Sequence, residues 1–385
     1  MKLSKLQLVE YRKPFKVGFH SPQIHRRAAE SVLLQLTFSN GCKAFGECAP
    51  RHYVTGESCR SVIDIMRDIA APLLFEADME SLADLVAILD EFERRCLEAG
   101  QHPFRSALAA IDLALLDALG RQADTHIADV IGRPPDYQVP RSISIPFLPT
   151  EQIEKLFGCL QDVISMDAVK VLMKDNLTEN IQRVAFIRSM IGPRMPIRIE
   201  ANGKWSTQEA LAHIEKLAPF GIVSVEEPLR KPTPERLGRL RAKIDIDLIL
   251  DESVCSLADA QKMAHACDGF NLKLSKCGGL LKLMAIADFA RDNGLMCQLG
   301  THVGEGPILD AAGWYAASSH TVFYNYEGYS SLLFLDLNHD PAALRDMTRK
   351  PKFQGPGLGV ALGDIAPLLD SPHTIEFGPN PGCAL

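Results

Sequence analysis

The chain has 385 residues and a formal net charge of -7, and 46% of its residues are hydrophobic. This length exceeds what one small core needs, so we expect two domains or one barrel with an added domain. The surplus of acidic residues argues against nucleic acid as a partner. The first residues lack the apolar segment of a signal peptide, and no apolar run reaches membrane-spanning length. We therefore expect a cytoplasmic protein with no membrane association.

Residues 1–125 show a pattern of strands followed by helices. Two β-rich runs flank Asn40 and Gly41, a pair that is typical of a hairpin turn. Further on, residues 106–120 are apolar nearly all round and predict a buried helix, with Gly120 expected at its C-terminal end. The pattern predicts an α+β domain.

Residues 126–345 alternate short apolar strands with amphipathic helices. The predicted strands are RSISIPF, DAVKVLM, PIRIEA, IVSVEEP, LILDES, GFNLKLS, LMCQLG and TVFYNYE. Eight strands with intervening helices over roughly 200 residues are typical of a β/α barrel. An open doubly wound sheet is the competing fold, but no GxGxxG motif follows an early strand. The loop-like segment 346–385 is expected to return to the first domain.

Three consecutive predicted strands end in an acidic residue, namely Glu200, Glu226 and Asp251. The intervals of 26 residues (226 minus 200) and 25 residues (251 minus 226) each correspond to one strand–helix unit, so neighbouring strands would bring the carboxylates to one mouth. Carboxylates so close repel one another unless a cation neutralises them, and oxygen ligands suit Mg²⁺. The alternative for each acid taken singly is a helix N-cap or a solvated loop residue.

Lysines are expected inside two of the barrel strands. Lys273 stands 22 residues after Asp251 (273 minus 251) and alternates with two leucines, so it should point opposite to them. Near a divalent cation its pKa should fall, which makes it a candidate base or acid at neutral pH. On an earlier strand, Lys170, Leu172 and Lys174 occupy alternate positions and share one face.

Six motifs follow one another along nearly the whole chain: ECAPRHYVTGES, EANGKW, VEEPL, LDES, NLKLSKCGG and GTHVGEG. In sequence and order they resemble the enolase superfamily, and more narrowly its muconate lactonizing enzyme (mandelate racemase/muconate cycloisomerase) subgroup. The resemblance implies a modified TIM barrel, (β/α)7β, under an α+β N-terminal capping domain that the C-terminal segment completes. It also implies removal of the proton α to a carboxylate, with Mg²⁺ holding the enediolate.

By matched position, the resemblance assigns roles to residues of this chain. Glu200, Glu226 and Asp251 would be the metal ligands, with Asn202 supporting them. Lys273 would be the acid/base on the sixth barrel strand. Glu200 departs from the family pattern, which has aspartate there, and the extra methylene would move the metal or alter its coordination.

The second barrel strand also departs from the pattern, which is Lys-x-Lys. Lys170 takes the first position, but Leu172 takes the second. An aliphatic side chain moves no proton, so racemisation that needs a base on each face of the carbanion loses support. Lys174 and His302 are candidates for the missing base, the alternatives being a solvated lysine and a hydrogen-bonding histidine. Glu305 matches a family glutamate that helps to organise the substrate carboxylate or its lysine.

Residues expected to select the substrate lie on the cap and on the eighth barrel strand. Arg51 and Tyr53 belong to a polar cap loop, and an arginine suits an anionic substrate group. Dipeptide epimerases of the superfamily hold a substrate ammonium with Asp-x-Asp on the eighth strand, where this chain has Asn325 and Glu327. The one carboxylate that remains on that strand allows a polar or weakly cationic substrate group. The cap residues are equally explained as part of a solvated rim, but together the polar cap loops favour a small polar carboxylic acid.

The leading hypothesis is a Mg²⁺-dependent isomerase or lyase that uses Lys273 as its principal base on a small carboxylic acid. Cycloisomerisation or β-elimination fits best, because either proceeds with one general acid/base. The alternatives are an acid-sugar dehydratase in which His302 joins Lys273, and a barrel that only binds an acid. The resemblance also implies a homo-oligomer.

Overall fold

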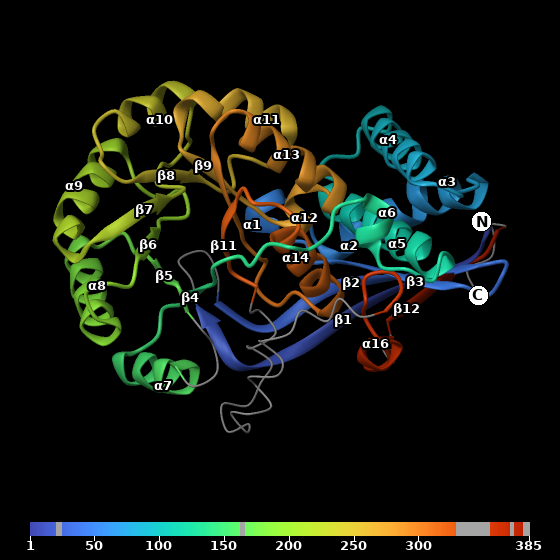
Figure 1. Cartoon of the computed structure of the whole chain (residues 1–385), viewed down its shortest axis with the longest axis horizontal. Coiled ribbons are helices and arrows are strands. Elements are labelled where there is room, and N and C mark those ends of the chain that lie inside the picture. Colours follow the sequence, from blue (N-terminus) through green and yellow to red (C-terminus); the bar gives the residue numbers. More distant parts are fainter. Residues whose placement is uncertain (21–24, 162–165, 329–354, 370–372, 380–385) are drawn as a thin grey trace.

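The structure, a computed structural model, describes residues 1–20, 25–161, 166–328, 355–369 and 373–379. They form a barrel of parallel strands inside a ring of helices and, beside it, a cap made of an antiparallel sheet and helices (Figure 1). The predicted fold class, an enolase-type TIM barrel with an α+β cap, is confirmed.

The cap sheet has four antiparallel strands in the order β12-β1-β2-β3. They are β1 (Leu3–His20), β2 (His25–Phe38), β3 (Lys43–Cys48) and β12 (Thr374–Phe377). The predicted hairpin joins β2 to β3, and in it the Phe38 N–H donates to the Cys42 carbonyl at 2.9 Å. Since β12 pairs with β1, the predicted return of the C-terminal segment to the cap is seen for this strand. The exact domain boundaries stay a prediction.

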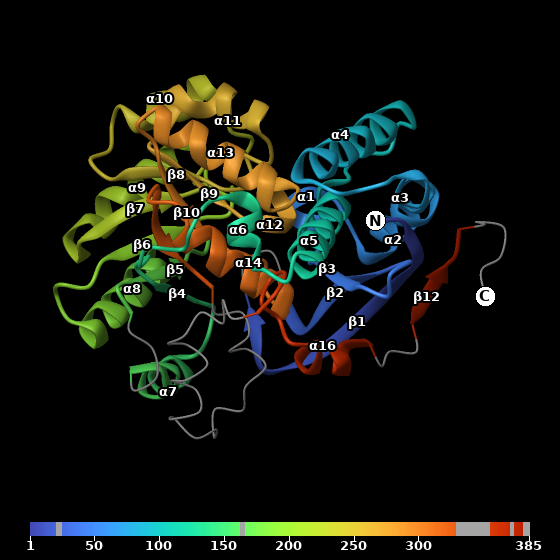
Figure 2. The same ribbon diagram turned by 45° about the vertical axis from the view of Figure 1, so that its right-hand side comes forward.

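Helices cover the cap sheet, and the longest of them, α5, lies along β3 (Figure 2). The cap helices are α1 (His52–Thr55), α2 (Cys59–Ile65), α3 (Ala71–Glu76), α4 (Leu82–Glu98), α5 (Arg105–Gln122), α6 (Ile127–Ile131) and α16 (Leu362–Leu369), and a π-helical turn spans Met66–Ala70. A Cβ added at Gly46 would lie 1.9 Å from the Ala110 carbonyl oxygen, so the glycine lets α5 touch the sheet backbone. This contact explains why α5 is apolar nearly all round.

The prediction that this helix ends at Gly120 is wrong. It continues to Gln122, and a Cβ at Gly120 would lie 2.7 Å from the Gly357 Cα. The glycine therefore allows close approach of the C-terminal segment instead of forming a left-handed helix end. Asp117 fixes the same segment, because its buried carboxylate accepts hydrogen bonds from the Leu358 N–H at 2.8 Å and the Phe45 N–H at 2.9 Å.

The barrel strands follow one another around the sheet in sequence order. They are β4 (Ser142–Ile145), β5 (Ala168–Leu172), β6 (Ile197–Glu200), β7 (Ile222–Glu226), β8 (Asp247–Leu250), β9 (Gly269–Leu272), β10 (Met296–Leu299) and β11 (Phe323–Tyr326). A parallel bridge between Arg141 and Tyr326 brings the last strand back to the first. All C-terminal strand ends consequently face one mouth, where barrels carry their chemistry.

The barrel helices lie outside the strands (Figure 1). They are α7 (Thr150–Gln161), α8 (Leu177–Ile191), α9 (Thr207–Leu217), α10 (Pro234–Arg241), α11 (Leu257–Met263), α12 (Leu274–Cys277), α13 (Leu280–Asp292) and α14 (Pro307–Ser318). Short polar residues begin several of them: the side chains of Ser206, Thr233 and Ser256 each accept a backbone N–H of the first turn. None of the helices in the described ranges combines the length and apolar character that a membrane span requires.

Candidate active site

The predicted acidic residues meet at the mouth of the barrel. Glu200 ends β6 and is paired in register with Glu226, the last residue of β7. Asp251 directly follows β8, and Lys273 directly follows β9. The alternation of side chains along parallel strands thus brings together residues that lie up to 73 positions apart (273 minus 200).

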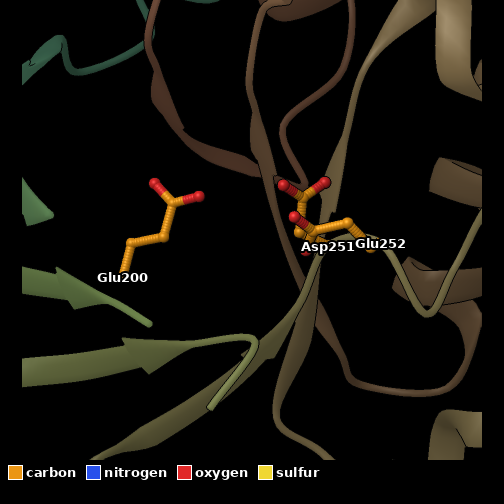
Figure 3. A group of neighbouring side chains, drawn as sticks. All are labelled: Glu200, Asp251 and Glu252. Carbon is orange, nitrogen blue, oxygen red and sulfur yellow. The ribbon is translucent and has the colours of Figure 1, made fainter. Parts of the chain in front are cut away.

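Three carboxylates stand where one cation would reach them all. Ligand oxygens of Glu200, Asp251 and Glu252 lie within 4.8 Å of one another. Figure 3 shows the Glu200 carboxylate on one side and those of Asp251 and Glu252 together on the other. Glu252 has no role in the prediction from sequence, although the LDES motif contains it. The chain turns directly after β8, and both neighbouring acids reach the mouth.

Glu226, predicted as a metal ligand, is turned toward other partners. Its carboxylate accepts hydrogen bonds from Asn271 Nδ2 at 2.7 Å and Gln298 Nε2 at 2.5 Å, and Lys170 Nζ lies 3.2 Å away. These buried amide donors, on β9 and β10, hold the Glu226 carboxylate. The group of three in the structure contains Glu252 and does not contain Glu226. Asn202 lies as expected beside the group and donates from Nδ2 to Glu200 Oε1 at 2.5 Å.

The charges of the mouth leave room for a divalent cation. Six carboxylates, those of Glu200, Glu226, Glu227, Asp251, Glu252 and Glu327, stand with four cationic side chains, Lys170, Arg198, Lys273 and Lys276. When all are ionised, this set has two more negative than positive charges. Burial and the neighbouring carboxylates raise the pKa of Glu226 to about 7 and the pKa of Glu252 well above its ordinary value.

One carboxylate oxygen of this set also lacks a partner. Glu252 Oε2 is buried and accepts no hydrogen bond from any described residue. A buried acceptor without a donor is costly, and a bound cation would remove that cost together with the repulsion between carboxylates. The hard oxygen donors of the group fit an ion such as Mg²⁺.

Two lysines hold Asp251. Lys273 Nζ lies 2.5 Å from Asp251 Oδ2, while the fully buried Lys276 lies 2.9 Å from Oδ1 and donates to the Asn271 carbonyl at 2.6 Å. The lowered pKa that the sequence predicts for Lys273 applies beside a bound cation and stays a prediction. Burial alone lowers this pKa, but Asp251 and Glu200 outweigh it and raise the pKa of Lys273.

The stretch with alternating lysines is divided between the barrel interior and the surface. Lys170 is buried and pairs with Glu200 at 2.8 Å. Leu172 is buried on the same face, level with Glu200 on the next strand. The Lys174 side chain is 46% exposed and pairs with Glu179 at 2.6 Å. The structure therefore does not bring Lys174 into the site as a replacement base.

His302 is buried beside the site and has a defined tautomer. Its Nδ1 lies 2.7 Å from the Ala49 carbonyl oxygen, which only accepts, so Nδ1 carries the proton and Nε2 bears a lone pair. Nε2 is buried with no hydrogen-bond partner among the described residues. Burial and the positive charges of Lys273 and Arg51 lower the pKa of His302 well below its ordinary value, which keeps the ring neutral.

Glu305 stabilises the loop that carries His302. Its Oε1 accepts the His302 N–H at 2.7 Å, and burial raises the pKa of Glu305 to about 8. At neutral pH this carboxyl group is therefore largely protonated. It adds little negative charge to the neighbouring mouth.

Of the residues expected to bind substrate, Arg51 has another role. Its buried guanidinium donates to the carbonyls of Glu30 at 2.9 Å, Pro50 at 2.7 Å and Val303 at 2.6 Å. It therefore joins the cap to a barrel loop, because β2 and that loop present carbonyls that need donors. Tyr53 lies half-buried on α1.

The two predicted residues of the eighth strand are also engaged within the protein. Asn325 Oδ1 accepts from Ser142 Oγ at 2.6 Å. Glu327 pairs with Lys170 at 2.9 Å and with Arg198 at 2.6 Å. Arg198 is fully buried and was not singled out from sequence; its position two residues before Glu200 on the same strand is the signal that it points inward.

Comparison with family models places the chain. Residues 5–132 match "Mandelate racemase / muconate lactonizing enzyme, N-terminal domain", and residues 159–366 match "Enolase C-terminal domain-like". The chain belongs to the mandelate racemase/muconate lactonizing enzyme family of the enolase superfamily. It is an enzyme of that superfamily, and its named relatives include racemases, epimerases and a cycloisomerase.

Similarity to individual members of the family extends over most of the chain. The N-succinyl-L-Arg/Lys racemase of Bacillus cereus is 24% identical over 94% of this chain and 96% of its own length, and its crystal structure gives a TM-score of 0.83 over 98% and 100% of the two chains. Muconate cycloisomerase 1 of Rhodococcus opacus is 27% identical over 86% and 88%. A dipeptide epimerase of Cytophaga hutchinsonii, crystallised with Mg and D-Ala-L-Val, gives a TM-score of 0.77 at 22% identity over 87% and 89%.

The geometry predicts that Glu252 contributes to cation binding in this enzyme. We expect Glu252→Gln to weaken Mg²⁺ binding at least about tenfold, because the substitution removes one negative charge from the group of three. Isothermal titration with Mg²⁺ measures the affinity. Glu179→Gln, which removes the charge of an exposed acid outside the group of three, is the matched control and should bind Mg²⁺ as the unchanged protein does. Equal affinities for all three proteins would contradict a role for Glu252.

Proposed function

We propose that the chain is a Mg²⁺-dependent isomerase or lyase that removes the proton α to the carboxylate of a small acid from one face only. The observation that carries the proposal is the contrast between two opposite strands. Lys273 follows β9 beside the carboxylates, whereas β5, four strands away in the eight-stranded order, presents Leu172. Opposite strands of a closed barrel face each other across its axis, so the substrate meets a base on one side and an apolar wall on the other.

Glu200, Asp251 and Glu252 would hold the metal, and Asn202 keeps Glu200 in place. The role of Glu226 as a further ligand, implied by the family resemblance, stays a prediction; its carboxylate borders the group. When bound, Mg²⁺ supplies the positive charge that a dianionic enediolate needs. The acidic group and the relatives crystallised with Mg support this choice of ion.

The protein's own side chains would move the proton. Lys273 Nζ, which lies 2.5 Å from Asp251 Oδ2, would take the α-proton as the general base. A cation held by Asp251 would offset the negative charge that raises the pKa of this lysine. Lys276 Nζ donates to the carbonyls of Asp251 and Asn271 and to Asp251 Oδ1, so it holds that carboxylate in place. Lys170 Nζ forms ion pairs with the carboxylates of Glu200, Glu226 and Glu327. These three ion pairs keep Lys170 protonated, so it would not act as a base.

A site with only one base favours some reactions of the family over others. Racemisation of a free carbanion requires proton delivery to the face opposite to removal, and Leu172 occupies that face. Cycloisomerisation and β-elimination can each proceed with one general acid/base. We therefore favour these reactions over two-base racemisation, although the racemase from Bacillus cereus is similar over nearly the whole chain.

An acid-sugar dehydratase is the second candidate, and the unpartnered Nε2 of His302 favours it. His302 follows β10, the strand next to β9, so it lies on the same side as Lys273. Its lone pair is placed to accept a hydrogen bond from a substrate hydroxyl. A dehydration product from a library of sugar acids, lost in His302→Ala, would establish this activity.

The proposed base has a sharp test. Incubation in D₂O with Mg²⁺ and a panel of N-succinyl amino acids, dipeptides, muconolactone and sugar acids should reveal α-proton exchange by NMR. Lys273→Ala should slow exchange at least about 100-fold, because it removes the general base. Lys174→Ala removes an exposed lysine and should exchange at the rate of the unchanged protein. Exchange that persists in Lys273→Ala would overturn the assignment.

The ion pairs of Glu327 predict which acids bind. Both of its oxygens face buried cations, so the Glu327 carboxylate is not free to pair with a substrate ammonium. We expect N-acetyl-L-alanyl-L-glutamate to bind at least about tenfold more tightly than L-alanyl-L-glutamate, because only the latter buries an unpaired ammonium. Competition titrations with Mg²⁺ present compare this matched pair. Tighter binding of the free dipeptide would show that Glu327 leaves its partners for the substrate.

A further inference from the structure

The end of the cap strand β3 contacts both catalytic loops of the barrel. The contact residues belong to residues 47–51, which we call the cap corner. The peptide unit of Ala49 makes two of the contacts: its N–H donates to Ser275 Oγ at 3.0 Å, and its carbonyl accepts from His302 Nδ1 at 2.7 Å. Ser275 lies two residues after Lys273. One residue of the cap therefore touches the segments that carry both proposed acid/base groups.

Glu47 holds the same barrel loop from its other end. Its carboxylate is fully buried and accepts the N–H of Gly306 at 2.7 Å, of Ile308 at 3.2 Å and of Leu309 at 3.3 Å. These donors form the first turn of α14, so a cap carboxylate satisfies a barrel helix that has no side-chain N-cap of its own. Tyr11 completes the arrangement by donating to Glu47 at 2.5 Å.

The loop between these two attachments is short and tightly packed. Arg51 binds the Val303 carbonyl at 2.6 Å, and a Cβ added at Gly304 would lie 2.8 Å from the Ala29 Cβ. Glu305 spans the loop internally through the His302 N–H. The loop is therefore held at His302 and at the start of α14, with close contacts between. We expect a shift of α14 relative to the cap to displace His302.

We infer that Glu47 is a positioning residue: by anchoring α14 to the cap corner, it holds the His302 ring in the tautomer that aims a lone pair into the site. The inference rests on the proposed function, which makes the neighbourhood of Lys273 the reacting centre. Glu47 itself would touch neither substrate nor metal, because its oxygens are engaged by Tyr11 and the helix.

Two substitutions disturb this anchor from opposite sides. Glu47→Gln places an amide where the N–H groups of α14 need an acceptor. Gly306→Ala acts from the barrel, since a Cβ there would lie 2.5 Å from Glu47 Oε1 while the Gly306 φ of -98° suits alanine. The matched control is Gly238→Ala on α10, where a Cβ meets nothing within 4 Å. Tyr11→Phe removes one donor but leaves the helix contact in place.

The experiment reads the ring directly by ¹⁵N NMR of the full-length protein labelled at histidine, with His302→Gln used to assign the signals. The unchanged protein, Gly238→Ala and Tyr11→Phe should show His302 protonated at Nδ1 and bare at Nε2. Glu47→Gln and Gly306→Ala should show averaged or exchanged tautomers. Their α-proton exchange should also slow at least about tenfold, as expected of a misplaced catalytic group.

Two outcomes would be decisive against the inference. Glu47→Gln that keeps the Nδ1-protonated ring shows that the anchor does not position His302. An equal disturbance in Gly238→Ala shows that general destabilisation is the cause. If no acid of the panel exchanges its α-proton in the unchanged protein, the proposed function fails, but the tautomer measurement still decides whether Glu47 positions the ring.

Discussion

The structure depends on keeping several carboxylates close together in a buried place. Asp251 is the centre of this arrangement, because two lysines bind its side chain and its neighbours Glu200 and Glu252 complete a group of three. Buried like charges are tolerated only when cations offset them. Lys170, Arg198, Lys273 and Lys276 offset most of the charge, and a divalent ion would offset the remainder. The fold provides the positions, since each acid stands at the end of a neighbouring strand.

The face opposite Lys273 distinguishes this chain from a two-base enzyme of the same architecture. Leu172, on β5, lies level with Glu200 of the next strand inside the barrel. Lys174, two residues further along the chain, is turned outward and pairs with Glu179. The proposed chemistry of one face rests on this asymmetry. His302 strengthens it, because the residue lies on the side of Lys273 and its neutral ring adds an acceptor there.

Much of this arrangement is predictable from the sequence because it depends on period and spacing. Acids one strand–helix unit apart predict a common mouth, and the alternation around Lys273 predicts its inward direction. The role of Gly120 is not predictable in this way, because it is set by Gly357, which lies 237 positions away (357 minus 120). The sequence predicts that Arg51 and Glu327 bind substrate, whereas partners from distant segments engage both side chains. Pairwise contacts between remote residues have no local signature. Glu252 is different, because it adjoins Asp251, and the turn directly after β8 brings both carboxylates to the mouth.

The central claim, proton removal from one face only, is tested most directly by the stereochemistry of exchange. The two enantiomers of an acid that exchanges its α-proton are incubated separately with the enzyme, Mg²⁺ and D₂O, and both deuterium content and optical purity are followed. The account predicts deuterium in one enantiomer alone, with its configuration retained. Comparable exchange into both enantiomers, accompanied by racemisation, would contradict it and would require a second base on the side of Leu172.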